Sequence, residues 1–380
     1  MKICAVICEY NPFHNGHLYQ LREAKKRSGA DAILCIMSGN FVQRGEAAIM
    51  DKFTRAKHAV FGGADAVIEL PTVFATSNAE LFAKGAVSIL SKIPSVSTLC
   101  FGAETADKNA FLKTAALLNN EPAYVSAEIK ALTAEGMSYA KARMTAWQDI
   151  TDATLLSSPN NILGLEYTRA ILAANAPIDI LPIERIGGGY NDASLYDGIS
   201  SASAIRNAIQ QGTDVENRLP DYVKAELPEK IDNALDALEK YALLSRSAEN
   251  IARICDCSEG LENAFKKAAL LSAPLAETLT SARYTSSRIR RIALQNLLNI
   301  DETLIGKSLH SPLYLRVLGI KKTRSDLLTA LSESQLPIIA RAHDENVLTD
   351  VAKQTYNVDI FAENVYGLLF TRSSERVIFH

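Results

Sequence analysis

The chain has 380 residues, of which 48% are hydrophobic and 22% charged, and its net charge at pH 7 is −3. This length predicts two domains or three, and the composition is that of an ordinary globular protein. The overall charge gives no reason to expect a nucleic acid or an acidic membrane as a partner.

The cysteines and the N-terminal sequence both indicate the cellular compartment of the protein. The six cysteines form no CxxC pair, so we expect no zinc site and a reducing compartment. The N-terminus lacks the features of a signal peptide, and no apolar run is long enough to cross a bilayer. We therefore expect a cytoplasmic protein without membrane contact.

The first predicted strand, Ile3–Cys8, leads into a tight turn and a helix start. The turn places two imidazoles and a row of free backbone N–H groups together, since it reads Asn11-Pro12-Phe13-His14-Asn15-Gly16-His17. A helix N-terminus binds anions, so this pattern favours the phosphates of a nucleotide. A metal site would need a third ligand, which we do not find nearby. The alternative is a pair of surface histidines at a helix cap.

Strands and helices alternate through residues 1–210. Near-continuous apolar runs, typical of strands covered on both faces, occur at Ile3–Cys8, 33–37, Ala66–Leu70, 98–101 and 180–183. Helical apolar patterns lie between them. The alternation predicts an α/β fold with a Rossmann-like parallel sheet. Such sheets bind ligands at the carboxyl ends of their strands, where the turn at 11–17 lies.

Polar residues at the next strand end are further candidates for the site. Gln43 and Arg44 lie in a glycine-flanked loop, where they are candidates to recognise a small carboxylate or to close over the nucleotide. A solvated loop is the alternative. Asp51, Lys52 and Arg55 begin the following helix, and an exposed helix face is enough to explain them.

A polar, acidic stretch at 212–220 predicts a linker, which divides the chain into residues 1–212 and 213–380. Beyond the linker the strand pattern fades, and residues 221–345 are rich in helix formers. We therefore expect a mainly α-helical C-terminal domain with a small α/β element near residues 336–339.

Positive charge is concentrated in residues 280–325, which contain nine Lys or Arg residues and two acids, Asp301 and Glu302. This excess indicates a surface that binds a polyanion, and a structured RNA is favoured because no DNA-reading motif is visible. Tyr284 and Tyr314 are candidates to stack on unpaired bases. The alternative is a solvated helix face with internal ion pairs. The candidate RNA contacts are Arg283, Arg288, Arg290 and Arg291.

Two motifs resemble the signature of the nucleotidylyltransferase superfamily. One is the strand followed by His14-Asn15-Gly16-His17, and the other, at 198–206, is similar to the superfamily's I-S-S-T-x-I-R element. The resemblance implies that His14 and His17 contact nucleotide phosphates, and that Ser201, Ser203 and Arg206 bind phosphate as well. The usual threonine falls at Ala202 or Ser203, depending on the alignment. A plain serine helix cap with a surface arginine is the alternative.

Further segments narrow this resemblance to the bacterial tRNA(Met) cytidine acetate ligase family, namely 37–46, 68–71, 101–104, 158–164 and 185–190. Without the family resemblance, a role of Asn160 or Asn161 as the helix cap is an equal alternative. The ATP site implied by the resemblance consists of Ile7, Cys8, Glu9, Tyr10, Asn11, Pro12, Phe13, His14, Asn15, Gly16, His17, Leu18, Tyr19, Gln20, Gly102, Asn160, Arg185 and Ile186.

The resemblance also implies the reaction. Acetate attacks the α-phosphate of ATP to give acetyl-AMP, and the N4 amine of the wobble cytidine in elongator tRNA(Met) takes the acetyl group to give N4-acetylcytidine. His14 and His17 would act by positioning and electrostatics, with Mg²⁺ accompanying the triphosphate. Two alternatives keep the nucleotide site: a cytidylyl- or adenylyltransferase acting on a small metabolite, and a non-catalytic RNA-binding factor with ATP as ligand. The oligomeric state is left open, a homodimer included.

Overall fold

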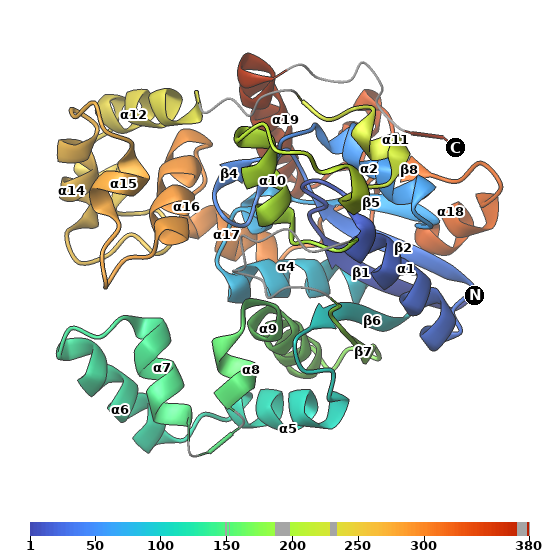
Figure 1. Ribbon diagram of the computed structural model, residues 1–380, viewed down its shortest axis with the longest axis horizontal. Coiled ribbons are helices and arrows are strands. Elements are labelled where there is room, and N and C mark those ends of the chain that lie inside the picture. The colour runs from blue at the N-terminus through green and yellow to red at the C-terminus, as the bar shows by residue number, and fades with distance from the viewer. Residues whose placement is uncertain (149, 152, 187–197, 229–233, 371–377, 380) are drawn as a thin grey trace.

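The computed structural model describes residues 1–148, 150–151, 153–186, 198–228, 234–370 and 378–379. Its centre is an eight-stranded sheet with helices on both faces (Figure 1). The strands follow the order β10-β8-β5-β2-β1-β6-β7, and β9 pairs with β8 outside this path. Five strands pair in parallel and confirm the five predicted ones: β1 (Ile3–Cys8), β2 (Ala32–Ser38), β5 (Ala66–Leu70), β6 (Val96–Ala103) and β7 (Asp179–Glu184).

Alternate side chains of β1 belong to two different apolar cores, as a strand covered on both faces requires. Ile3 and Ile7 pack in the core that includes α4 and α9, whereas Val6 packs in the core that includes α1 and α2. The bounds of these helices are α1 (Asn15–Ser28), α2 (Lys52–Phe61), α4 (Ala79–Leu90) and α9 (Pro159–Ala173), with the short α3 (Thr72–Ala75) before α4.

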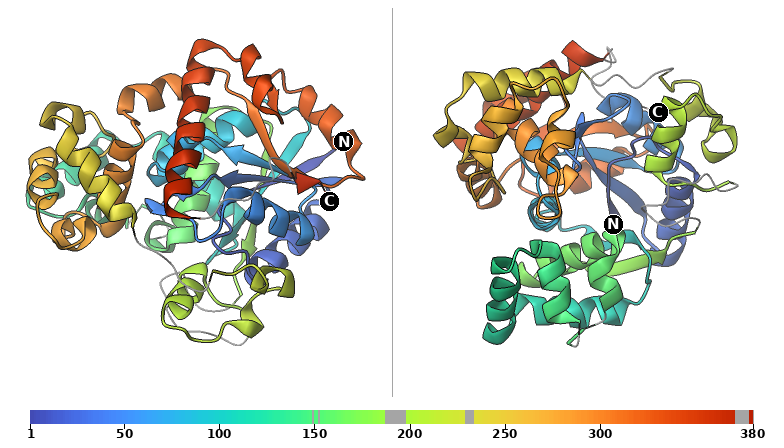
Figure 2. Two further views of the ribbon diagram at one scale, coloured as in Figure 1. Left: turned by 90° about the horizontal axis from the view of Figure 1, so that it is seen from above. Right: turned by 60° about the vertical axis from the view of Figure 1, so that its left-hand side comes forward.

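Two groups of helices extend from the sheet on one side (Figure 2). The chain between β6 and β7 forms the first group, which consists of α5 (Lys108–Asn119), α6 (Ala123–Ala134), α7 (Tyr139–Trp147), α8 (Ala153–Ser157) and α9. The second group has a hydrophobic cluster of its own and consists of α12 (Leu235–Ser245), α13 (Ala248–Ile251), α14 (Leu261–Ala268), α15 (Leu275–Leu279) and α16 (Ser286–Leu297). Between β7 and this group lie α10 (Ala202–Gln210), η1 (Glu216–Arg218) and α11 (Asp221–Lys224).

The chain then returns to the sheet. Strand β8 (Leu315–Ile320) runs antiparallel to β5, and β9 (Ile338–Ile339) and β10 (Ile378–Phe379) pair in parallel with β8. β9 is the element expected near 336–339. The C-terminal part is mainly helical, as predicted, although its β8 belongs to the N-terminal sheet. The division at residue 212 stays a prediction. The helices of this return are α17 (Glu302–Leu309), α18 (Ser325–Ser332), η2 (Ala342–Val347) and α19 (Asp350–Leu369).

A buried ion cluster connects this C-terminal segment to the sheet. Lys52 Nζ lies 2.8 Å from Glu69 Oε1 and 3.2 Å from Glu363 Oε2. Arg316 contacts the same two carboxylates at 3.2 Å and 2.9 Å. All four side chains are buried, so each charge is compensated by an opposite one from a different element.

The start of α2 is therefore not an exposed helix face, and that alternative is wrong. Asp51 is the N-cap and accepts the Phe53 N–H, Lys52 joins the ion cluster, and Arg55 is fully buried. Local sequence suggested a charged surface because the carboxylates and carbonyls that compensate these cations come from distant segments.

Candidate active site

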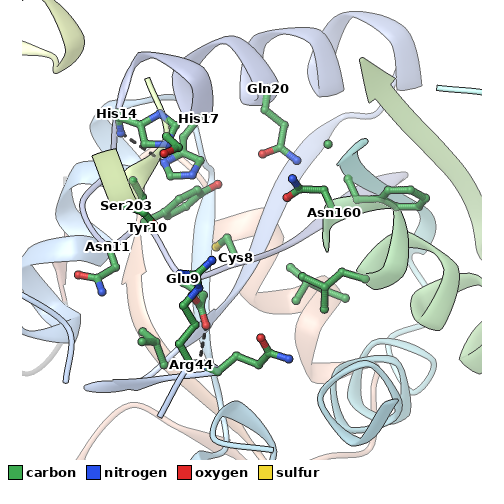
Figure 3. Close-up of a pocket in the computed structure, with 18 of the residues that line it drawn as sticks. Cys8, Glu9, Tyr10, Asn11, His14, His17, Gln20, Arg44, Asn160 and Ser203 are labelled. Carbon is green, nitrogen blue, oxygen red and sulfur yellow. Dashed lines mark hydrogen bonds between the residues drawn. The ribbon is translucent and has the colours of Figure 1, made fainter. Parts of the chain in front are cut away.

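A pocket opens at the carboxyl ends of β1, β6 and β7, where the sequence predicted ligand binding (Figure 3). The predicted residues that line it are Ile7, Cys8, Glu9, Tyr10, Asn11, His14, His17, Gln20, Gly102, Asn160, Arg185, Ser201, Ser203 and Arg206. An adjoining pocket that shares five of these is also lined by Gly16, Tyr19 and Ile186. Segments 7–20, 102, 160, 185–186 and 201–206 are thus brought together. The predicted segment 187–190 lies outside the described residues.

Four predicted ATP-site residues, all in the described part of the chain, line neither pocket: Pro12, Phe13, Asn15 and Leu18. They support the turn. Phe13 is fully buried and packs edge-on against Tyr10, with ring centroids 4.9 Å apart. Asn15 Nδ2 donates to the carbonyl oxygens of Gly198 and Asn217 at 3.0 and 3.1 Å, which ties the turn to the segment before and after α10.

His14 and His17 form a stacked pair at the start of α1. His14 is the N-cap, and its Nδ1 accepts the Gly16 N–H at 3.0 Å. His17 Nδ1 accepts the His14 N–H at 3.3 Å, and the ring centroids are 3.6 Å apart. Because each Nδ1 accepts a hydrogen bond, we assign the proton of each neutral ring to Nε2. The pair therefore offers two N–H donors to a ligand.

The surroundings keep both rings neutral. Burial lowers the pKa of His14 to about 3, and the positive charges of Arg185 and Arg206 add to this effect. Burial likewise lowers the pKa of His17 well below its ordinary value, with contributions from His14 and Arg185. His14 is buried, so the alternative of two surface histidines is wrong for it. The positive charge of the site comes from the arginines.

Arg206 is fixed against the turn from the opposite side of the pocket. Its Nη1 donates to the Asn11 carbonyl at 2.7 Å, and its Nη2 to Ser203 Oγ at 3.3 Å. Ser201 is the N-cap of α10, with its Oγ accepting the Ala204 N–H at 3.1 Å. The helix-cap interpretation of Ser201 is thus confirmed, and the free N–H groups of that helix start lie at the same pocket as the helix start of α1.

Asn160 is held by a carboxylate and is not the cap of α9. Ser158 occupies the N-cap position, and Glu104 Oε1 accepts from Asn160 Nδ2 at 2.6 Å. Glu104 Oε2 accepts the Asn161 N–H at 3.0 Å, while Asn161 Oδ1 accepts the Glu104 N–H at 2.9 Å. This reciprocal pairing fixes the start of α9 against the end of β6, beside Gly102.

The residues of this pocket lie within a match to a known protein family. The family model of the HIGH nucleotidyl transferases matches residues 1–378. The chain belongs to this family. A tRNA(Met) cytidine acetate ligase of Thermoanaerobacter sp. (strain X514) is 38% identical over 390 residues, covering 98% of this chain and 97% of that protein. The ligase of Thermosipho africanus (strain TCF52B) is 36% identical, covering 99% and 97%. The resemblance to the acetate ligase family is confirmed.

Solved structures give the same result. Thermotoga maritima TmcAL without ligand is 29% identical and matches with a TM-score of 0.90 over 100% of both chains. The same protein bound with alpha-thio ATP is 30% identical and matches with a TM-score of 0.87 over 100% of both chains. The α/β fold with a helical C-terminal part is therefore that of a HIGH nucleotidyl transferase.

Several features of this HIGH nucleotidyl transferase site were missed by the sequence reasoning. Phe82, Phe101, Leu163 and Tyr167 form an apolar wall of the pocket. Phe82 had been recognisable only as part of the apolar face of a helix. Arg55 lies beneath the pocket and donates to the carbonyls of Glu9 at 2.5 Å and Ser38 at 3.2 Å, which fixes the ends of β1 and β2 together. The candidates Gln43 and Arg44 do line the pocket, so a merely solvated loop is wrong.

Three of the four candidate RNA contacts are paired with acids from other segments. Arg283 contacts Glu259 at 2.7 Å, and Arg291 lies 3.6 Å from Asp256. Arg288 Nε and Nη2 donate to the Asp256 carbonyl. Arg290 pairs with Glu46. The alternative of ion pairs is thus confirmed for Arg283, Arg290 and Arg291, whereas Arg288 is held by a backbone carbonyl. RNA contact by these four side chains stays a prediction. Tyr314 is fully buried, which makes base stacking by it wrong.

The described residues contain no group of three or more His, Cys, Asp or Glu placed to hold a metal ion. Within the same ranges, no helix has the length and apolar character needed to cross a membrane. All six cysteines are free thiols.

Proposed function

We propose that the chain is an ATP-dependent ligase that activates acetate as acetyl-AMP and acetylates N4 of the wobble cytidine of elongator tRNA(Met). The observation that carries this proposal is the neutral histidine pair at the start of α1, which shares one pocket with Arg185 and Arg206. The similarity to tRNA(Met) cytidine acetate ligases supports tRNA(Met) as the acetyl acceptor, and the structure of TmcAL with alpha-thio ATP supports ATP as the nucleotide.

In this proposal the triphosphate lies between the starts of α1 and α10. The Nε2–H groups of His14 and His17 donate to the α-phosphate, where charge builds up as acetate attacks phosphorus. Arg206 and the N–H groups behind Ser201 and Ser203 receive the departing pyrophosphate. Neutral donors suit this step because they stabilise the extra charge without holding the nucleotide too tightly beforehand.

The adenosine would lie against Gly102, Asn160 and Ile186, and the neighbouring Arg185 would contact the phosphates. Glu104 already takes the Asn160 Nδ2 donor, so Asn160 would meet the nucleotide as an acceptor through Oδ1. Gly102 leaves space beside this contact, because an added Cβ would have the Arg185 Cγ, at 3.4 Å, as its nearest neighbour. Mg²⁺ would accompany the triphosphate and be bound mainly by phosphate oxygens and water, since no acidic cluster is found in the described residues.

The tRNA would contact a groove between the α6–α7 pair and the helices around α16. Arg283, Arg288 and Arg291 line this groove together with Arg143 and Arg169 from the first helical group. Glu80, Glu121, Glu166, Asp256 and Glu259 line it too, so phosphates would replace carboxylates as partners of the arginines. Binding should weaken steeply with salt, because each phosphate contact releases counterions. With tRNA and ATP as substrates, we place the reaction in the cytoplasm.

The test uses ATP, labelled acetate and bulk tRNA. We expect label in tRNA and acetate-dependent release of pyrophosphate. His14→Ala and His17→Ala should each lower the acetate-dependent exchange of pyrophosphate into ATP by about 10²-fold or more, as expected for loss of a transition-state donor. Both variants should still bind tRNA. Release of pyrophosphate that requires a metabolite other than acetate, with no label in tRNA, would instead show a small-molecule nucleotidylyltransferase.

A further inference from the structure

One side chain in the pocket does not suit a site for anions. Glu9 follows the last residue of β1, is half-buried and lines the same pocket as His14, His17 and Arg206 (Figure 3). ATP and acetate are both negatively charged, so a carboxylate at this place repels them. Among the described residues no ion pair with Glu9 is found, and the charges of Arg206, Arg55 and Arg44 act on it without one. A function in the chemistry would explain why a carboxylate stands here.

The Glu9 carboxylate is held in a defined position. Its Oε1 accepts the Gln43 N–H at 2.7 Å, and its backbone carbonyl accepts from Arg55 Nη1 at 2.5 Å. These contacts come from the turn after β3 (Phe41–Val42) and from α2, so two separate segments fix the residue. Figure 3 shows the side chain between the histidine pair and Arg44. The carboxylate is thus presented to the cavity by a rigid backbone, as a reacting group requires.

The other polar groups of the pocket are poor proton acceptors. The Nδ1 atoms of His14 and His17 already accept backbone N–H groups, so only their N–H donors face a ligand. Arg185 and Arg206 cannot accept protons. Glu104, beside the pocket, uses both carboxylate oxygens on the start of α9. Among the described residues that line the pocket, Glu9 is therefore the carboxylate available to a substrate.

We infer that the Glu9 carboxylate accepts a hydrogen bond from the N4 amine of the target cytosine and acts as the general base of acetyl transfer. The inference rests on the proposed function. A carboxylate is the usual protein acceptor for the exocyclic amine of cytosine. That nitrogen is a weak nucleophile because its lone pair is delocalised into the ring, so it must lose a proton as it attacks. The N4 atom bonds to the acetyl carbon, the bond from that carbon to the phosphate oxygen breaks, AMP leaves, and one N4 proton passes to the Glu9 carboxylate.

The environment supports this role. Burial raises the pKa of Glu9, while the Gln43 N–H and the charges of Arg206, Arg55 and Arg44 act in the opposite direction. A carboxylate with a raised pKa is a stronger base than an ordinary one. In this role Glu9 both binds the cytosine N4 amine through a hydrogen bond and accepts the proton that this amine loses.

The two half-reactions separate this role from nucleotide binding. Glu9→Gln keeps an oxygen that can accept the Gln43 N–H, so the loop should stay in place. Because Glu9 lines the nucleotide pocket, the acetate-dependent pyrophosphate exchange of the same variant, with acetyl-AMP trapped by hydroxylamine, is the reference, and we expect transfer to fall far more than exchange. Acetyl transfer to tRNA should fall by about 10²-fold or more in kcat, the range measured for general bases. The acidic limb of the pH–rate profile for transfer should disappear. The control is Glu23→Gln, which changes a half-buried carboxylate paired with Arg27 on α1.

Each other outcome overturns the inference. If Glu9→Gln acetylates tRNA at the unmodified rate, Glu9 is not the base. If exchange and transfer fall together, Glu9 serves the nucleotide or its metal ion instead. If the unmodified protein itself shows no acetate-dependent exchange, the proposed function fails, and the inference fails with it. Failure of the proposed function appears as missing exchange in the unmodified protein, whereas failure of the Glu9 inference alone appears only in the Glu9→Gln variant. The two failures are therefore distinguishable.

Discussion

Arg290 on α16 forms an ion pair with Glu46, which begins the short strand β4 (Glu46–Ala47). The other Glu46 oxygen lies 3.7 Å from Arg206 Nη2, so one carboxylate stands between the basic helix and the phosphate end of the pocket. Gly45, with φ of 72°, permits this approach, because an added Cβ would lie 2.5 Å from the Arg290 carbonyl carbon. The candidate RNA surface and the nucleotide site are therefore in contact through the hairpin of β3 (Phe41–Val42) and β4.

This contact predicts different effects for two neighbouring arginines. Arg290→Ala frees Glu46 to compete with phosphate for Arg206, so the KM for ATP in pyrophosphate exchange should rise about two- to fivefold, the effect of a partly exposed ion pair. Arg288→Ala is the matched control, since Arg288 contacts Asp256 and Ser258 within the helical group. It should weaken tRNA binding and leave that KM unchanged. An equal KM in both variants would contradict the coupling.

The neutral state of His14 predicts a pH-dependent stability. The pKa of His14 is about 3 in the folded chain and about 6.5 when unfolded, so the unfolded chain binds the proton first as the pH falls. The contribution of neutral His14 to the unfolding free energy is fully present above pH 6.5 and is lost progressively as the pH falls toward 3. His14→Asn keeps a capping side chain but does not titrate. Between pH 7 and 5 the unmodified protein should lose about 2 kcal/mol more unfolding free energy than the variant in denaturant titrations.

His58 provides the internal reference for that comparison. Its pKa is lowered to about 4, mainly by burial, and it is present in both proteins, so its contribution cancels. Equal losses of stability in the two proteins would show that His14 is not held neutral by the fold.

Gly102, which lines the pocket, and Gly164, which is buried in α9, should respond differently to substitution by alanine. Gly102→Ala has room for its Cβ in the protein alone, so the melting temperature should stay unchanged while the KM for ATP rises about tenfold. Gly164→Ala would place Cβ 2.4 Å from Phe101 Cε2. Overpacking costs about 1–3 kcal/mol and exceeds the helix-propensity gain of about 1 kcal/mol, so this variant should melt earlier. An earlier melt for Gly102→Ala would show that this glycine serves the fold.

The buried ion cluster predicts a large loss on removal of one partner. Lys52→Met leaves Glu69 and Glu363 close together without their shared ammonium, and the unfolding free energy should fall by about 3–5 kcal/mol. Lys84→Ala removes an exposed pair with Glu80 on α4 and should cost about 0.5 kcal/mol or less. Similar losses in the two variants, measured by denaturant unfolding, would contradict the role assigned to the cluster.

The sequence was informative where the determinants were local. The apolar runs predicted the five parallel strands, and the turn between Asn11 and His17 predicted the helix start, because strand burial and helix capping depend on neighbouring residues. The motifs at 198–206 and 160 were brought to the same pocket, as the family resemblance implied.

The sequence was uninformative where partners came from distant segments. The acids that pair with Arg283, Arg290 and Arg291 lie at Glu259, Glu46 and Asp256, so counting acids within 280–325 missed them. Lys52 and Arg55 looked like surface residues because most of their compensating groups belong to distant segments, namely β2, β5, α19 and the residue that follows β1. The antiparallel β8 was missed for a similar reason, since its register is set by β5, about 250 residues earlier.

The central claim is that acetyl-AMP made in this pocket is used on one cytidine. The most direct measurement is transfer of labelled acetate to an elongator tRNA(Met) transcript and to a matched transcript whose wobble cytidine is replaced by uridine, with ATP present in both. We predict label in the first transcript, recovered as N4-acetylcytidine after digestion, and none in the second. Equal label in both transcripts, or none in either, would contradict the claim.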